Sequence, residues 1–192
     1  MITADAGVRP FRLNRDAFLA LLETGLVPEG RGTELFDGEI VTEMPQGPFH
    51  LFVYEALEAV FADAGLLGRR IRGGSTVGLS RFDLVDPEFV WIERPRGSFG
   101  LPTPEDVRWA IEVSVSSRAY DLSDKRAKYA EAGIPDYWVF DVTARRLHRF
   151  TRPEDGAYTR VAVDGPDGTF EMPGGLGTID LGAIYAFPAD AS

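Results

Sequence analysis

The spacing of apolar side chains along the chain alternates between the period of a helix and the period of a strand. Helical spacing predicts amphipathic helices over residues 13–25, 48–64 and 116–133, each ending at a glycine. Period-two alternation is clearest over residues 107–115 and leaves Glu112 on a polar face, opposite the bulky apolar row. Further strands are predicted over 33–44 (a hairpin turning at Asp37-Gly38), 73–79, 84–92, 137–141, 147–151, 158–163, 169–172 and 179–185.

The order of these segments indicates how the sheet is built. Strand 107–115, helix 116–133 and strand 137–141 follow one another with short joins, which predicts a right-handed crossover and parallel pairing of the two strands. No repeat or break in composition marks a second domain, and 192 residues with 44% apolar side chains suffice for one core. We therefore expect one domain over residues 1–192, with its core over about 13–185.

Cysteine and histidine content restricts the chemistry. The absence of cysteine excludes disulfides, thiolate nucleophiles, iron–sulfur clusters and thiolate zinc sites. His50 and His148 are the only histidines, which excludes a histidine-rich metal site, and the arginines around His148 favour a surface position for it. Carboxylates and carbonyls would have to hold any metal ion, which favours magnesium, manganese or calcium.

The formal charge of −10 argues against a protein that binds nucleic acid through a broad positive field. Two local groups of arginines are candidate phosphate contacts, or alternatively solubilising charges at strand edges. They are Arg69, Arg70 and Arg72, and Arg145, Arg146 and Arg149. No apolar run approaches the roughly 18 residues of a membrane span, and the first residues lack the pattern of a secretion signal, so we expect a cytoplasmic protein.

Lysine use is unusual, because 18 of the 20 basic residues are arginine and the two lysines stand three apart. Asp121, Lys125 and Lys128 fall on one stripe of the helix predicted over 116–133. An ammonium is a compact point charge that the planar guanidinium does not replace at a catalytic position. The alternative is an exposed helix face on which the lysines form ordinary ion pairs with Asp121 and Asp124.

Three glutamates lie where adjacent strands can bring their carboxylates together. Glu34 begins the first predicted strand, Glu88 follows a proline on another, and Glu112 lies centrally in 107–115. Adjacent strands stand about 4.8 Å apart, so these carboxylates could share a hard divalent cation that keeps positions open for water and a phosphate oxygen. Alternatively Glu34 and Glu88 are solvated, whereas a buried carboxylate at Glu112 needs a partner.

Several short motifs occur in a fixed order along the chain. They are Glu34-Leu35-Phe36-Asp37-Gly38-Glu39-Ile40-Val41, His50, Pro87-Glu88, Glu112 with Ser116-Ser117, Asp121, Lys125, Tyr129, Ala132-Gly133 and Asp136-Tyr137-Trp138-Val139-Phe140-Asp141. In this order they resemble the Uma-type family of restriction endonucleases, in the PD-(D/E)XK nuclease superfamily. The resemblance implies an α/β fold of the restriction-endonuclease type, with a central mixed β-sheet flanked by helices and a β-rich C-terminal extension.

The resemblance also implies residue roles, with Mg²⁺ or Mn²⁺ as the cofactor. The catalytic candidates are Glu88, Glu112 and Lys125, the metal ligands Glu88, Glu112 and Glu34, and the supporting residues Glu34, His50, Asp121 and Lys128. The family's lysine has moved to the helix, so Ser114 occupies the strand position that holds lysine in the superfamily pattern. The family more often has aspartate where this chain has Glu88.

The function implied by the resemblance is metal-dependent hydrolysis of phosphodiester bonds in nucleic acid, with DNA favoured and a homodimer expected. Two alternatives stay open. One is a non-catalytic binding or structural domain that keeps the nuclease fold. The other is a phosphodiesterase for a small nucleotide, which tolerates an acidic surface better than long DNA does.

Overall fold

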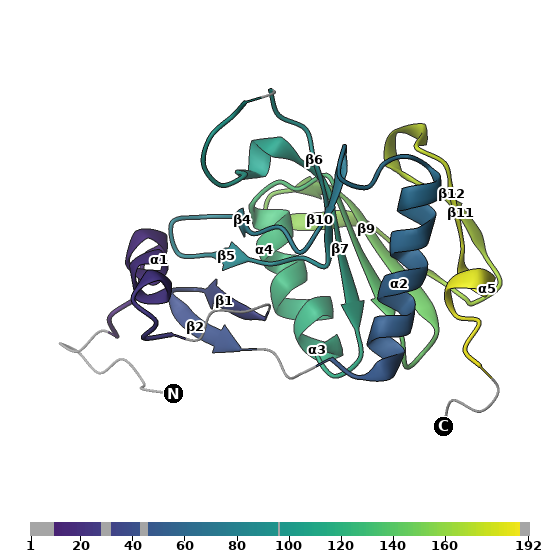
Figure 1. The fold of residues 1–192 in the computed structure, drawn as a ribbon, viewed down its shortest axis with the longest axis horizontal. Coiled ribbons are helices and arrows are strands. Elements are labelled where there is room, and N and C mark those ends of the chain that lie inside the picture. Colours follow the sequence, from purple (N-terminus) through teal and green to yellow (C-terminus); the bar gives the residue numbers. More distant parts are fainter. Residues whose placement is uncertain (1–9, 28–31, 43–45, 96, 189–192) are drawn as a thin grey trace.

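The computed structural model describes residues 10–27, 32–42, 46–95 and 97–188. Its centre is a six-stranded sheet in the order β10–β9–β8–β7–β6–β3 (Figure 1). These strands are β3 (Ile71–Gly73), β6 (Phe89–Ile92), β7 (Val107–Ser114), β8 (Asp136–Asp141), β9 (Arg146–Glu154) and β10 (Ala157–Asp164). β7 and β8 are parallel and the other neighbours are antiparallel, so the predicted mixed sheet and its parallel pair are confirmed.

A helical segment joins the two parallel strands. It consists of α3 (Arg118–Tyr120), η2 (Asp121–Lys125) and α4 (Arg126–Glu131), and η2 is a π-helical turn. Gly133 has φ +75°, a backbone conformation that favours glycine, and follows the end of α4. The helix predicted over 116–133 is confirmed, whereas the π-helical turn, a feature frequent at functional sites, was not visible in the periodicity.

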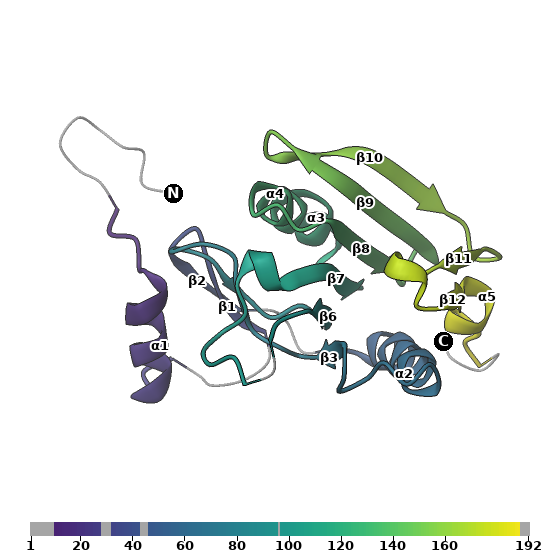
Figure 2. The same ribbon diagram turned by 90° about the horizontal axis from the view of Figure 1, so that it is seen from above.

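A second sheet of four short strands packs against the same face of the central sheet as α4. Its order is β2–β1–β5–β4, with β1 (Thr33–Phe36), β2 (Glu39–Thr42), β4 (Val77–Gly78) and β5 (Leu84–Val85). Asp37 and Gly38 have φ +53° and +77°, as a two-residue hairpin turn requires. The hairpin predicted over 33–44 is confirmed as far as Thr42, and residues 43 and 44 lie outside the described residues. Outside this sheet lies α1 (Arg15–Glu23), remote from the β9–β10 hairpin (Figure 2), with Asn14 as its N-cap.

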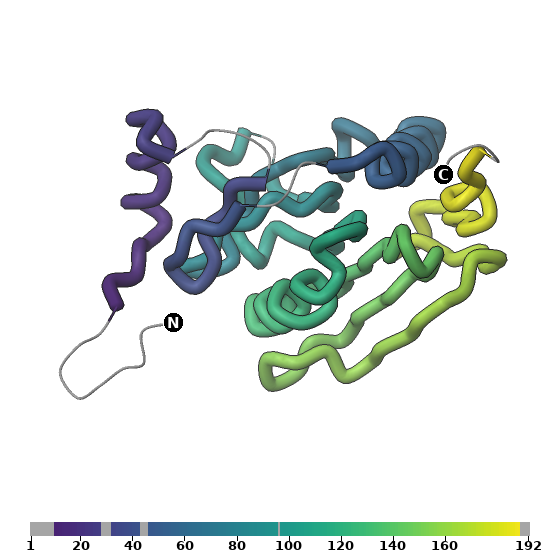
Figure 3. Tube along the Cα trace, turned by 90° about the horizontal axis from the view of Figure 1, so that it is seen from below, coloured from purple at the N-terminus to yellow at the C-terminus, as the bar shows by residue number. Residues whose placement is uncertain are grey.

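Both faces of the central sheet are covered. α2 (Pro48–Asp63) packs Val53 and Phe61 against one face, whereas α4 and the small sheet cover the other. In Figure 3, α2 and the β9–β10 hairpin lie on opposite sides of the molecule. β7 is consequently buried on both faces, and Glu112 is only 4% exposed. Glu112 lies on the face opposite Trp109, Ile111 and Val113, as the alternation predicts, but this face is buried as well, which alternation along a strand does not reveal.

The C-terminal part is β-rich, as predicted, but its last strand is shorter. β11 (Thr169–Glu171) pairs with β12 (Thr178–Asp180), and the chain then forms α5 (Leu181–Ile184). The predicted strand over 179–185 is therefore wrong beyond Asp180, whose side chain accepts a hydrogen bond from Gly182 N and caps the helix. Two 3₁₀ turns, η1 (Pro104–Asp106) and η3 (Pro173–Gly175), complete the elements.

His148 does not lie on the surface as expected. Its side chain is largely buried beside Asp141, and burial lowers the pKa of the imidazole. None of the helices in the described ranges has the length and apolar character needed to cross a membrane. The expectation of one domain over residues 1–192 stays a prediction.

Candidate active site

The centre of the site is a buried lysine held between carboxylates. Lys125 Nζ lies 3.1 Å from Glu34 Oε1, 3.2 Å from Glu112 Oε1 and 3.9 Å from Asp121 Oδ1. All four side chains are almost completely buried. The alternative in which Lys125 sits on an exposed helix face is therefore wrong, although its contact with Asp121 exists.

Three parts of the fold supply these groups. Glu34 comes from β1 of the small sheet, Glu112 from the middle of β7, and Asp121 and Lys125 from the ends of the π-helical turn η2. Glu34 Oε1 also accepts a hydrogen bond from Asp86 N at 2.9 Å, which holds its carboxylate in place. The cluster therefore forms only where the small sheet, the central sheet and the crossover helix meet.

Tyr129 supports Glu112 from α4. Its hydroxyl donates to Glu112 Oε1 at 3.2 Å, and the residue is 1% exposed. Burial, followed by the negative charge of Glu112, raises the pKa of Tyr129 well above its usual value. The raised pKa keeps the phenol protonated, so that it can donate its hydrogen bond to Glu112.

Glu88 contacts a different pair of side chains. Its Oε1 accepts a hydrogen bond from Gln46 Nε2 at 2.5 Å and lies 2.9 Å from His50 Nε2. Glu88 directly precedes β6, whose first residue, Phe89, pairs with Ile111 of β7 next to Glu112. His50 from the first turn of α2 contacts Glu88 rather than the lysine cluster.

The charges of the cluster fit a cation. Glu34, Glu112 and Asp121 surround a single ammonium, so the carboxylates outnumber the buried positive charge among these residues. Oxygen donors of this kind are those that magnesium and manganese prefer. Within the described ranges, however, no group of three or more histidine, aspartate or glutamate side chains is arranged as a ready set of metal ligands. The predicted ligand set of Glu34, Glu88 and Glu112 therefore stays a prediction.

Lys128 belongs to a separate group near the surface. Its Nζ lies 2.6 Å from Asp37 Oδ1, 3.7 Å from Asp83 Oδ2 and 3.5 Å from Glu131 Oε2. These contacts join α4 to the turn of the β1–β2 hairpin. The structure thus separates the two lysines that the sequence places on one stripe.

The candidate arginines lie on the surface, with varied partners. Arg149 Nε donates to Asp164 Oδ2 at 2.7 Å, and its guanidinium carbon lies 4.6 Å from the centre of the Phe170 ring. Arg70 and Arg145 lie over the rings of Trp91 and Phe187. The exposed members are Arg69, Arg70, Arg72, Arg145 and Arg146, and their contact with nucleic acid stays a prediction.

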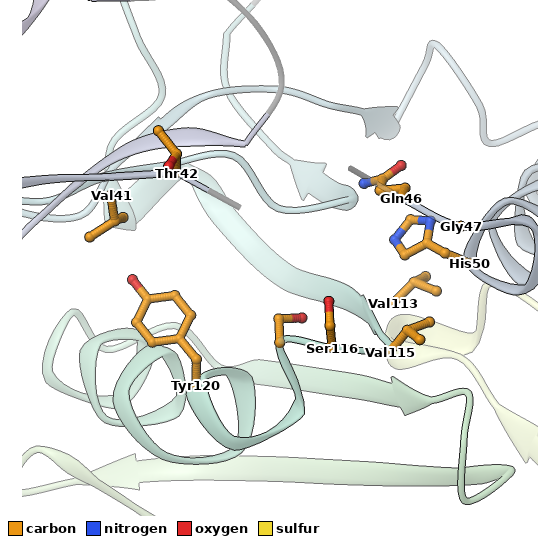
Figure 4. Close-up of a pocket in the computed structure, with 10 residues that line it drawn as sticks. Val41, Thr42, Gln46, Gly47, His50, Val113, Val115, Ser116 and Tyr120 are labelled. Carbon is orange, nitrogen blue, oxygen red and sulfur yellow. The ribbon is translucent and has the colours of Figure 1, made fainter. Parts of the chain in front are cut away.

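A cavity of about 630 Å³ adjoins the side chains that contact Glu88 and Asp121. It lies between β2, the start of α2 and the start of the crossover helix (Figure 4). Figure 4 shows the Tyr120 ring reaching from α3 toward Val41 and Thr42 of β2, with His50 and Gln46 at the other end. Val113 and Val115 line the cavity on the side of His50. The cavity therefore lies at the carboxyl end of β7.

Three further residues contact the predicted site residues. Gln46, which contacts Glu88, is not among the candidates, whereas Ser117 and Tyr129, which contact Asp121 and Glu112, are named only as motif residues. Helical spacing indicates the last two, because Ser117 stands four positions before Asp121 and Tyr129 four after Lys125. Gln46 lies before the start of α2, and no spacing within one segment links it to Glu88.

Known proteins supply two comparisons. The model of the Uma2 family, described as "Putative restriction endonuclease", matches residues 15–181. The fold is similar to a crystal structure described as that of "a putative nuclease belonging to DUF820 from Anabaena variabilis ATCC 29413", with a TM-score of 0.68 and 16% identity, covering 91% of this chain and 98% of that one. No curated protein matches the chain.

These comparisons bear on two predictions. The family resemblance is confirmed by the match over residues 15–181. The α/β fold with a central mixed sheet is confirmed as that of the solved structure, although a likeness at 16% identity concerns the fold alone. The roles of individual residues are not tested by either comparison.

Proposed function

The chain belongs to the Uma2 family of nucleases, and from this we propose that it is a metal-dependent enzyme that hydrolyses phosphodiester bonds in nucleic acid. The observation that carries the proposal is the buried ammonium of Lys125, 3.1 Å from the Glu34 carboxylate and 3.2 Å from that of Glu112. A lysine is expensive to bury, and partners from two different sheets are needed to keep it charged there. Because the carboxylates outnumber this ammonium, the cluster suits a divalent cation, and the cation together with Lys125 would attract a phosphate.

The proposed reaction is a displacement at phosphorus. The oxygen of water forms a bond to phosphorus, the bond from phosphorus to one sugar oxygen breaks, water releases a proton, and the leaving oxygen takes one up. Mg²⁺ or Mn²⁺, held by Glu88 and Glu112 with Glu34, would polarise the phosphate and neutralise part of its charge. Lys125 donates hydrogen bonds to the phosphate oxygen on which negative charge increases.

Neighbouring side chains orient these groups. The Tyr129 hydroxyl fixes the Glu112 carboxylate from one side, and Asp121 holds Lys125 from within the same helical turn. His50 Nε2 and Gln46 hold the carboxylate of Glu88. Preorganised donors of this kind need no rearrangement during the reaction, which is how enzyme electrostatics lowers a barrier.

The test is cleavage of labelled DNA and RNA in the presence of manganese, together with calorimetric titration of manganese. Glu112→Gln is expected to lose at least about a hundredfold in cleavage rate and to bind manganese more weakly. Glu154→Gln, an exposed position on β9, is the matched control and keeps both properties.

Two outcomes contradict the proposal. Equal cleavage by the Glu112→Gln and Glu154→Gln variants would remove the assigned role of Glu112. A parent protein that neither binds manganese nor cleaves any nucleic acid would favour the alternative of a non-catalytic domain that keeps the fold.

A homodimer is a separate part of the proposal, and it rests on the family resemblance alone. Light scattering at several protein concentrations measures the mass directly. A monomer at all concentrations overturns this part and leaves cleavage of one strand at a time.

A further inference from the structure

One wall of the cavity touches the proposed metal ligand Glu88. Gln46 and His50 line the cavity, and both contact Glu88 Oε1, at 2.5 Å and 2.9 Å. Because Glu88 Oε1 lies within hydrogen-bond distance of both Gln46 and His50, only these two side chains separate this end of the cavity from Glu88. A group bound in the cavity would lie next to the site of hydrolysis.

The opposite wall of the cavity lies close to Lys125. Ser117 lines the cavity and donates to Asp121 Oδ2 at 2.5 Å, and Asp121 in turn contacts Lys125. Tyr120 also lines the cavity, and the centre of its ring lies 5.6 Å from Lys125 Nζ. The cavity therefore adjoins Glu88 on the side of α2 and the lysine cluster on the side of the crossover helix.

Among the residues of the lining that the structure describes, none is a lysine, arginine, aspartate or glutamate. Its apolar part consists of Val41, Val113, Val115 and the ring of Tyr120, and its polar part of Thr42, Gln46, Ser116 and Ser117. Phosphate groups bind where cations are available, so this lining does not suit the backbone of a nucleic acid.

A nucleobase fits this combination of groups. Its flat faces pack on valine and aromatic side chains, and its edge takes hydrogen bonds from hydroxyl and amide groups such as those of Ser116 and Gln46. The volume of about 630 Å³ lies in the range of pockets that bind small organic molecules. The base would enter the cavity while its phosphate stays at the cluster.

We propose that the cavity binds the base of an unpaired nucleotide next to the scissile phosphate, so that the substrate is single-stranded nucleic acid. This inference rests on the proposed function, because the neighbouring cluster is what places the phosphate. A base within a duplex is stacked and paired, and it reaches a pocket only after leaving the stack. The formal charge of −10 agrees with a substrate that needs less positive field than a long duplex.

The first experiment measures binding by the intact protein in EDTA, which separates binding from cleavage. The probes are a short fluorescein-labelled single strand, a hairpin duplex of the same length, and single strands with one abasic position each. The single strand is expected to bind at least about tenfold more tightly than the hairpin. One abasic position is expected to weaken binding by about tenfold or more, the effect of losing one base–aromatic stack.

A pair of variants tests whether the weaker binding of the abasic strand is due to the cavity. Val41→Trp fills the cavity and is expected to abolish the difference between the parent strand and the abasic strand. Ile40→Trp is the matched control, because Ile40 is the preceding residue of β2, is 36% exposed and does not line the cavity. The abasic series needs no variant, so a Val41→Trp protein that fails to fold leaves the test intact.

The outcomes separate this inference from the nuclease itself. Equal binding of strand, hairpin and abasic strands overturns the base-binding cavity even if Glu112-dependent cleavage is observed. Position-specific loss in the abasic series without any cleavage supports the cavity and contradicts the proposed function. A nucleoside monophosphate that binds as tightly as the strand overturns the assignment to single-stranded nucleic acid and makes a small nucleotide the ligand.

Discussion

Lys125 and Lys128 stand three residues apart on one helical segment, and the structure gives them different surroundings. The side chain of Lys125 is 1% exposed and contacts carboxylates from β1, β7 and its own turn. The side chain of Lys128 is 17% exposed and contacts Asp37, which is itself half exposed. Lys125 is enclosed where three elements meet, whereas Lys128 joins two elements at their edge.

The difference shows how burial changes the contribution of an ion pair to the stability of the fold. Breaking a buried pair leaves a charge without water or a partner, which is strongly destabilising. Breaking an exposed pair costs little, because water and salt already screen it. The same residue type is therefore expected to dominate stability at position 125 and to contribute modestly at position 128.

The largest effect is expected for Lys125→Met, which leaves the Glu34 and Glu112 carboxylates buried around an uncharged side chain. We expect the free energy of unfolding to fall by about 3–5 kcal/mol, measured by urea denaturation. A loss no greater than that of Lys128→Met would contradict the contrast between the two lysines.

Replacement by arginine sharpens the comparison, since it keeps the charge. Lys125→Arg puts a larger planar group into a filled site and is expected to cost about 1–3 kcal/mol and to impair cleavage. Lys128→Arg, the matched control, is expected to change stability by less than about 0.5 kcal/mol. Thermal and urea unfolding of both variants measure the difference, and equal tolerance at the two positions would refute it.

A smaller effect is expected for Lys128→Met. The contacts with Asp37, Asp83 and Glu131 are partly exposed, so we expect a loss of about 0.5–1 kcal/mol in the free energy of unfolding. Repeating the measurement in high salt should reduce this loss, because salt screens exposed pairs. A loss independent of salt would place Lys128 in a drier environment than the structure does.

The smallest effect is a pH dependence at the Lys128 group. The hydrogen bond from Lys128 lowers the pKa of Asp37, against the opposing effect of burial. A lowered carboxyl pKa stabilises the folded state above the unfolded value of about 3.9, and this stability is lost as the pH falls through the lowered value. The stability difference between the parent and Lys128→Met should therefore shrink below about pH 4.

The control for this pH dependence is Asp37→Asn. Since it removes the titrating carboxyl, Lys128→Met in that background should show no corresponding change between pH 5 and pH 3, a range that spans the ordinary carboxyl pKa. The same slope with and without Asp37 would assign the effect to another group.

Local sequence determined much of the fold. The hairpin at Asp37-Gly38 follows from two residues that tolerate positive φ, and the crossover between β7 and β8 follows from periodicity and short joins. The strand predicted over 179–185 failed because the N-cap at Asp180 starts a helix there. Periodicity over so few residues does not separate the two structures.

The order of short motifs was sufficient to identify the family and the candidates Glu34, Glu112 and Lys125, because the type and order of these residues can be identified in the sequence without the structure. Only the tertiary structure decided that Lys125 is buried and Lys128 is not, and that Glu88 contacts His50 and Gln46. Burial and partners depend on groups far apart in sequence, such as Glu34 and Lys125. They meet because the small sheet and α4 cover the same face of β7, and no spacing within one segment encodes that contact.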